Sequence, residues 1–211
     1  MNYKKLAVLA VGAVFAAQAA FADTGWLASY AYVWDGTDDT VYTLNGGFPD
    51  AVAGTPVGAF DDADLGTFNL GYTLFLNAEI SAWADGGDEF TDLSLWYRVY
   101  DNTPGAFAQQ SSSSIDNFGG NDWRGIATGV DLGGLGVGEY TVDIYVSRSH
   151  TWDAGTGGPF TTYLNTTGDT GGSEPTGDFF SASFEVIPEP GTMGLLVIGL
   201  LGAAGLRRRL S

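Results

Sequence analysis

Residues 138–147 read GEYTVDIYVS, and large apolar side chains occupy every second position of this stretch: Tyr140, Val142, Ile144 and Val146. The positions between them carry Thr141, Asp143, Tyr145 and Ser147. Successive side chains of a β-strand point to opposite faces, so these two sets would form the two faces of one strand. The stretch therefore predicts a β-strand with a buried apolar face.

The same period of two recurs at 71–83 (GYTLFLNAEISAW), 92–100 (DLSLWYRVY) and 179–186 (FFSASFEV). Turns rich in Gly, Asp, Asn and Pro separate further predicted strands at 26–34, 40–44, 65–70 and 125–132. No part of the body shows the period of an amphipathic helix. Seven or eight short strands of this kind predict an all-β fold, an antiparallel β-sandwich of jelly-roll or immunoglobulin-like topology; a small barrel is the alternative.

Two connections between these strands lack an apolar period. They are 102–121 (NTPGAFAQQSSSSIDNFGGN) and the Gly- and Thr-rich stretch 152–178. Polar segments of this length are typical of long surface loops, which often carry binding sites. We therefore expect both stretches to be loops.

The chain begins MNYKKLAVLAVGAVFAAQAAFAD. Lys4 and Lys5 precede an apolar run at 6–17, and Ala20-Phe21-Ala22 is a small-x-small cleavage site. This three-part pattern is typical of a secretory signal peptide, here residues 1–22, which signal peptidase removes during export. The alternative is a buried N-terminal helix.

The chain ends VIPEPGTMGLLVIGLLGAAGLRRRLS. Met193–Leu206 is 14 residues without a charge, and Arg207, Arg208 and Arg209 follow at once. At about 1.5 Å per residue this run covers roughly 21 Å, which is short of a ~30 Å hydrocarbon core. The positive-inside rule places the arginines in the cytoplasm and everything before Gly191 outside. We expect transient membrane anchorage through 191–206, in the orientation that the export signal also demands.

Pro188-Glu189-Pro190, a glycine-rich apolar segment and a terminal arginine cluster follow one another in the last 24 residues. This order resembles the PEP-CTERM sorting signal. The resemblance implies recognition and processing by an exosortase, a membrane transpeptidase-like enzyme of Gram-negative bacteria that make exopolysaccharide and biofilm matrix. It implies a protein of the cell envelope, cell surface or extracellular matrix. An ordinary C-terminal membrane anchor is the alternative reading.

Residues 23–187 form the predicted body, a single acidic domain of 165 residues without cysteine. It contains no lysine and only three arginines, Arg98, Arg124 and Arg148, against 24 Asp and Glu residues, for a formal charge of −21. An exported domain without disulfides depends on its core, on bound ions, or on both. The charge excludes nucleic acids and other polyanions as partners unless a cation bridges them.

Gly86–Phe90 spells GGDEF, the signature of the diguanylate cyclases. We interpret the match as accidental, because an exported domain meets no GTP and this one lacks the cations that hold a triphosphate. The arginine and aromatic residue that usually precede the signature are also absent, since Ala84 and Asp85 stand there. The stretch is better explained as an acidic turn between strands.

Acidic clusters suggest calcium as a candidate ligand, because hard cations take oxygen ligands and low-affinity sites suffice outside the cell. The body has three such clusters, of which Asp35/Asp38/Asp39 is the first along the chain. None of the three has the residue spacing of an EF-hand loop. The candidate calcium ligands are Asp61, Asp62, Asp64, Asp85, Asp88 and Glu89. The alternative is that these residues form solvated acidic turns.

Glycan binding is suggested by aromatic residues on the polar face of one predicted strand. If Leu93, Leu95 and Tyr97 face the core, Trp96 and Tyr100 face outward, about 13 Å apart. Flat aromatic rings suit the apolar faces of sugars. The alternative is that this face is covered and Trp96 belongs to a core.

The chain offers little for catalysis. Its single histidine, His150, has no evident serine partner, and there is no nucleophile-elbow motif. We therefore expect no enzyme and no cofactor beyond calcium, but a structural or adhesive protein of the exopolysaccharide or biofilm matrix. The alternatives are a carbohydrate-binding module, calcium-dependent or not, and a glycan-active hydrolase that uses two facing carboxylates.

Overall fold

The structure is a computed structural model that describes residues 24–46, 51, 54–85, 88–152, 157–189 and 191. The fourteen regular elements within these ranges are all strands. The predicted signal peptide at 1–22 and the tail from 192 onward, with its arginine cluster, lie outside the described residues, as does Pro190.

The strands form two seven-stranded sheets. Sheet A has the order β4-β3-β2-β6-β10-β9, with β1 paired to β6, and its strands are β1 (Thr24–Trp26), β2 (Ser29–Trp34), β3 (Asp39–Asn45), β4 (Gly58–Ala59), β6 (Phe75–Ala84), β9 (Ile115–Gly119) and β10 (Asp122–Asp131). Sheet B has the order β13-β12-β11-β14-β5, with β7 paired to β11 and to β8. Its strands are β5 (Ala63–Asn69), β7 (Glu89–Tyr100), β8 (Ala108–Ser111), β11 (Gly138–Trp152), β12 (Gly157–Asn165), β13 (Gly168–Asp169) and β14 (Phe180–Ile187).

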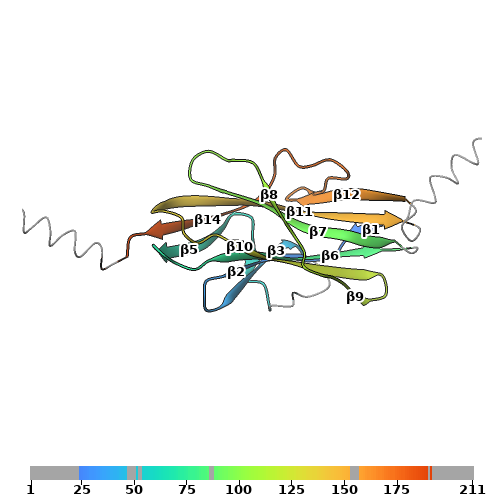
Figure 1. Ribbon diagram of the computed structural model, residues 1–211, viewed down its shortest axis with the longest axis horizontal. Helices are drawn as coiled ribbons and strands as arrows, with labels where there is room; N and C mark the ends of the chain where they lie inside the picture. The colour runs from blue at the N-terminus through green and yellow to red at the C-terminus, as the bar shows by residue number, and fades with distance from the viewer. Residues whose placement is uncertain are drawn as a thin grey trace, which may run out of the picture.

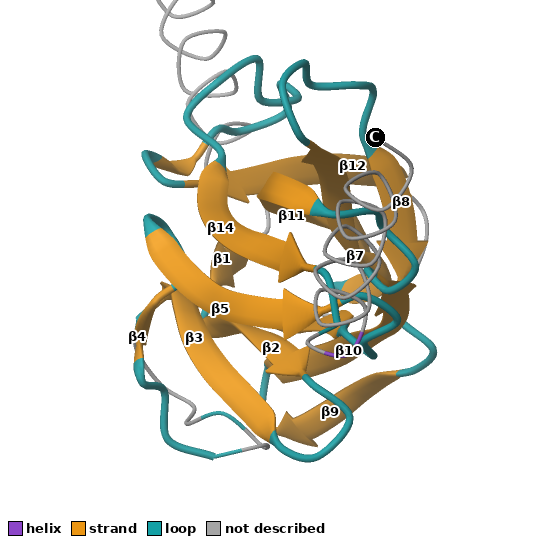
Figure 2. Ribbon diagram, turned by 90° about the vertical axis from the view of Figure 1, so that its left-hand side faces the viewer, coloured by secondary structure: helices purple, strands orange, loops and turns teal. Residues whose placement is uncertain are grey.

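The two sheets lie face to face, as the predicted sandwich requires (Figures 1 and 2). The alternation at 138–147 is confirmed, because Val142, Ile144 and Val146 of β11 have no exposed surface. They belong to the same core cluster as the apolar side chains of β6, Leu76, Ala78 and Ile80, which are also fully buried. The period of two therefore located the core correctly.

The sheets are mixed, since two strand pairs are parallel in the predicted antiparallel sandwich. β3 pairs with β4, and β5 pairs with β14 at the edge of sheet B (Figure 2). A crossing of three residues, Phe60–Asp62, carries the chain from β4 in sheet A to β5 in sheet B. Phe60 is fully buried at this crossing, and the backbone N–H of Asp62 donates to Ser181 of β14.

Both predicted long loops contain strands, so that part of the prediction was wrong. β8 and β9 lie within 102–121, and β12 and β13 lie within 152–178. β8 and β9 are edge strands with mostly exposed side chains, AQQS and IDNFG. Residues on such edges need no apolar period, so nothing in their sequence distinguished them from loops.

The body is elongated: its first strand begins at one end and its last strand ends at the other (Figure 1). β1 lies at one end, where Thr24 pairs with Ala84 at the end of β6. β14 ends at Ile187 at the other end, next to Asn69 of β5. Among the described residues, no helix has the length and apolar character needed to cross a membrane.

Candidate functional site

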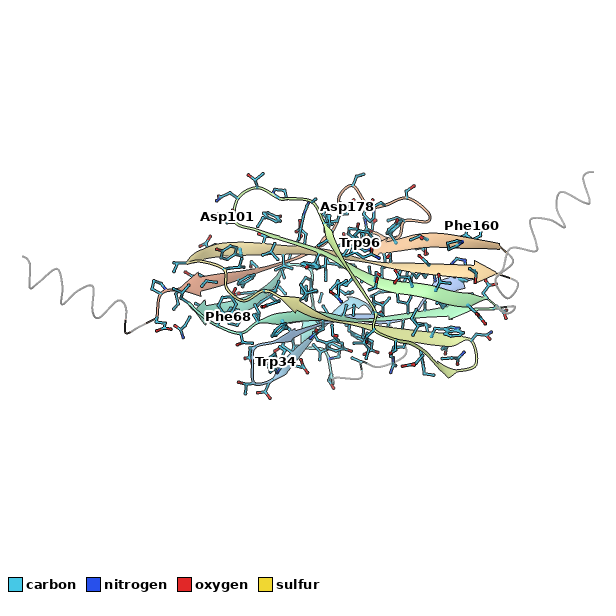
Figure 3. The ribbon with its side chains drawn as sticks, viewed as in Figure 1. Trp34, Phe68, Trp96, Asp101, Phe160 and Asp178 are labelled. Carbon is cyan, nitrogen blue, oxygen red and sulfur yellow. The ribbon has the colours of Figure 1, made fainter. Side chains whose placement is uncertain are left out.

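The predicted glycan-binding residues lie on the outer face of sheet B, the face turned away from sheet A. The register of β7 on β11 places Trp96 opposite Tyr145 and Arg98 opposite Asp143. Two connections, 101–107 and 170–179, pass over this face (Figure 1). Figure 3 shows Trp96 beneath these connections, with Asp101 and Asp178 above the sheet. The outward direction of Trp96 and Tyr100 was predicted, with a covered face as the alternative, and the two connections lie over that face.

Tyr145 is the centre of an aromatic cluster on this face and has no exposed surface. The ring of Trp96 stacks on it with centroids 5.6 Å apart, and the indole Nε1 of Trp96 donates to Ser147 at 2.9 Å. Phe107 and Phe179 from the two connections contact the same ring at 4.8 and 6.0 Å. This cluster gives sheet B a second, smaller apolar layer outside the main core.

The hydroxyl group of Tyr145 donates to Glu174 at 2.7 Å. Burial raises the pKa of this phenol, and the carboxylate of Glu174 raises it further, because both disfavour the phenolate. Tyr145 is therefore a neutral donor that fixes the connection 170–179 to the sheet.

Arg98 is held between the two connections. Its guanidinium carbon lies 4.5 Å from the ring centroid of Phe107 and 4.7 Å from that of Phe179. Its Nε and Nη2 donate to the same carboxylate oxygen of Asp143, at 2.9 and 2.6 Å. A planar guanidinium can stack on rings and bind a carboxylate at once, which an ammonium group cannot do. We call these four residues, Arg98, Phe107, Asp143 and Phe179, the Arg98 clamp.

Tyr100 also contacts Asp143, since its hydroxyl group donates to the carboxylate at 3.2 Å. Burial and this carboxylate raise the pKa of Tyr100. The second carboxylate oxygen of Asp143 accepts a hydrogen bond from Ser181 at 2.6 Å. Trp96 and Tyr100 thus both have partners within the sheet, and glycan binding by them stays a prediction.

The first predicted calcium cluster lies at the crossing between the sheets. The carboxylate of Asp61 accepts from the backbone N–H of Ser181 at 3.0 Å, and that of Asp64 accepts from Gly66 at 2.9 Å. Asp62 is exposed and has a φ of 61°, a conformation that Asp adopts more readily than most residues. These hydrogen bonds stabilise the turn.

The second predicted cluster lies in the connection from β6 to β7, with Gly86 and Gly87 outside the described residues. Asp85 is exposed and accepts from the side chain of Asn121 at 3.1 Å, whereas Asp88 is only 4% exposed. Within the described ranges, no three His, Cys, Asp or Glu side chains gather closely enough to hold a metal ion. Calcium binding at either cluster stays a prediction.

His150 does not lie at the surface, as a histidine at a strand end usually does. It is 7% exposed in β11, where its ring lies 6.0 Å from those of Phe90 and Phe160. Burial lowers its pKa, and Arg148 lowers it further, while Asp88 acts in the opposite direction. This environment favours a neutral imidazole.

All three arginines of the body form ion pairs, which were not predicted from the sequence. Besides the Arg98 clamp, Arg124 pairs with Glu79 at 2.8 Å and Arg148 with Asp169 at 3.2 Å. The guanidinium of Arg124 also lies over the ring of Phe118, and that of Arg148 lies over the ring of Trp26. The scarcity of cations in so acidic a body was the one signal that could have pointed to them.

Glu79 shows how a polar face becomes buried. It lies on the outer face of sheet A, has no exposed surface, and accepts a hydrogen bond from Tyr32. In the sequence it occupies an ordinary polar position of β6, so its burial could not be predicted.

The predicted sorting residues follow β14 without a break. Val186 is fully buried in the core, Pro188 and Glu189 come directly after the strand, and Glu189 is exposed. The PEP-CTERM protein-sorting motif matches residues 186–209, so its first two residues belong to the folded body. No curated protein and no solved structure matches the chain. The chain therefore carries a PEP-CTERM protein-sorting motif behind a β-sandwich body, which implies an exported, exosortase-sorted protein of the cell surface.

Proposed function

We propose that this protein is a non-catalytic component of the cell surface or extracellular matrix of a Gram-negative bacterium, with a structural or adhesive role among exopolysaccharides. The observation that carries the proposal is the continuity of β14 with the sorting motif. β14 lies between β11 and β5 in sheet B, so a pull on the tail acts on a strand bonded on both sides. Such a body can stay folded while it is attached or pulled through its C-terminus.

The environment of the buried ionisable residues supports a structural role. Asp143 and Glu79, the carboxylates in ion pairs with Arg98 and Arg124, each accept further hydrogen bonds from tyrosine side chains. Buried charges that are paired and hydrogen-bonded fix the geometry of a fold, and breaking one is costly. The ion pairs of Asp143 and Glu79 therefore stabilise the sheets and the connections that cover sheet B.

The sorting step is tested in an exosortase-containing host by replacing Pro188 and Pro190 together with alanine. We expect the variant to be retained in the membrane fraction, whereas the wild type reaches the cell surface and matrix. The matched control is Pro104→Ala in the exposed connection 101–107, which should be sorted normally. Equal distribution of the double variant and the wild type would contradict the proposal.

A carbohydrate-binding module is the second candidate, and one pocket favours it. This pocket, of about 300 Å³, lies beside the end of β7 and is lined by the apolar side chains of Val99, Leu132 and Leu135 together with Tyr97, Arg98 and Asp131. A sugar ring, which has hydroxyl groups at its edge and an apolar face, could bind to such a mixture of apolar and polar groups. Binding at this pocket is tested by comparing how much wild-type and Asp131→Asn protein co-sediments with the host polysaccharide, with and without calcium. Weaker co-sedimentation of the variant would support the pocket as the binding site. New reducing ends in the same assay would favour a glycan hydrolase instead.

A further inference from the structure

Three strands meet at the end of the body from which the tail departs. The backbone N–H of Leu70, just after β5, donates to the carbonyl group of Ile187 at 2.8 Å. On the other side of β14, Gly138 at the start of β11 pairs with Val186. Leu70 and Val137 therefore flank the exit point of the chain, one on each side. We call these two residues and their connections the tail-side tip.

The tail-side tip presents apolar side chains to solvent. Leu70 is 42% exposed and Val137 is 55% exposed. On either side of Leu70 in the sequence, the rings of Phe68 and Tyr72 stack at 5.2 Å, and Phe68 contacts Phe184 of β14 at 6.1 Å. Figure 3 shows Phe68 at this end of the body and Phe160 at the opposite end. Leu70 thus lies in a segment that packed aromatic rings hold against β14.

The sequence fixes how far this tip can lie from the tail. The uncharged run begins at Met193, six residues after Ile187. At no more than ~3.6 Å per residue, these six residues span at most about 22 Å. While the run is inserted in a membrane, the tip must therefore stay near the membrane surface. Such tethering gives even weak contacts a high effective concentration.

We propose that the tail-side tip is a lipid-contacting surface, which Leu70 and Val137 place against the interfacial region of the membrane before the tail is processed. The proposal rests on the proposed function, because it requires the tail to be inserted. Four exposed carboxylates stand near this end, Asp131, Glu139, Glu185 and Glu189. They repel anionic headgroups, so the surface fits a zwitterionic lipid such as phosphatidylethanolamine.

The absence of cysteine makes a direct test practical. The full chain is expressed in an exporting host without an exosortase, so that the tail is retained, and single cysteines are introduced as Leu70→Cys, Val137→Cys, Phe160→Cys and Leu201→Cys. Each carries an environment-sensitive fluorophore in vesicles of phosphatidylethanolamine and phosphatidylcholine, with a nitroxide quencher in the lipid. Circular dichroism confirms that each variant is folded.

We expect blue-shifted, lipid-quenched emission from the probes at 70 and 137 and water-like emission from the probe at 160, which is at the opposite end. Anionic lipid should weaken the quenching at 70 and 137. If the probe at 201 is quenched but those at 70 and 137 behave like that at 160, the lipid-contacting tip is wrong. If the probe at 201 is not quenched, the tail is not inserted, and the proposed sorting route fails with it.

Discussion

Tyr145 and Trp96 show how a side chain on the polar face of a strand can become part of a packed layer. The strand period places both outside the main core, yet the connections 101–107 and 170–179 cover Tyr145 completely. Their ring stack and the hydrogen bond from Trp96 to Ser147 are contacts within the fold.

Replacing Trp96 with alanine tests this structural role. We expect the free energy of unfolding to fall by about 2–3 kcal/mol, because large-to-small changes at fully buried aromatics cost roughly 3–5 kcal/mol and this ring is only part-buried. Urea denaturation gives the value. Phe160→Ala, at a ring that is 43% exposed, should cost much less. Unchanged stability of Trp96→Ala, with loss of polysaccharide binding, would instead identify a sugar platform.

His150 should make the stability of the body depend on pH. Its pKa is lowered in the folded state, so below the usual value of about 6.5 the unfolded state binds a proton that the folded state does not. The stability that the neutral imidazole contributes is therefore present above pH 6.5 and is lost as the pH falls from there to the folded pKa. Melting temperatures of the wild type and of His150→Gln across pH 5–8 isolate this effect. Parallel curves for the two proteins would contradict it.

The inner and outer faces of the strands were predictable to different degrees. β11 and β14 follow the period of two because one face lies in the core, and their predicted faces are confirmed. β8 and β9 could not be predicted, because edge strands with exposed side chains carry no such period. The Arg98 clamp was equally out of reach, since Asp143 and Phe179 lie far from Arg98 in sequence and meet it only on the outer face of sheet B.

The close approach of β10 to β7 depends on Gly125. A Cβ atom there would lie 2.5 Å from the hydroxyl oxygen of Ser112 and 3.0 Å from the side chain of Leu93. We expect Gly125→Ala to destabilise the body by about 1–3 kcal/mol through overpacking between the sheets. Gly58→Ala in β4 is the matched control, because its Cβ would meet nothing within 4 Å. Equal melting temperatures of the two variants would rule this packing out.

The Arg98 clamp should hold both covering connections in place. Arg98→Lys keeps the charge but loses the planar stacking between Phe107 and Phe179. We therefore expect faster amide hydrogen exchange throughout 101–107 and 170–179, with the core strands β6 and β11 unchanged. Arg124→Lys on sheet A serves as the comparison. Exchange that rises in only one of the two connections would show that the clamp does not join them.

The acidity of the whole body should appear in its response to ions. At a formal charge of −21, screening of self-repulsion should raise the melting temperature as salt is added. Calcium bound at Asp61, Asp62 and Asp64, or at Asp85, Asp88 and Glu89, would add a rise that magnesium at the same ionic strength does not produce and that EDTA reverses. Equal responses to calcium and magnesium would reduce these clusters to acidic turns.

The mass of the mature protein tests the central claim most directly, namely that a folded body is exported and sorted by the two ends of the chain. Intact mass spectrometry of the protein recovered from the surface or matrix of an exosortase-containing host should show a chain that begins at Asp23 and lacks Arg207–Arg209. The same chain from an exosortase-deficient host should keep its arginines and stay in the membrane fraction. Recovery of the chain with its arginine cluster intact from the matrix of both hosts would contradict the account.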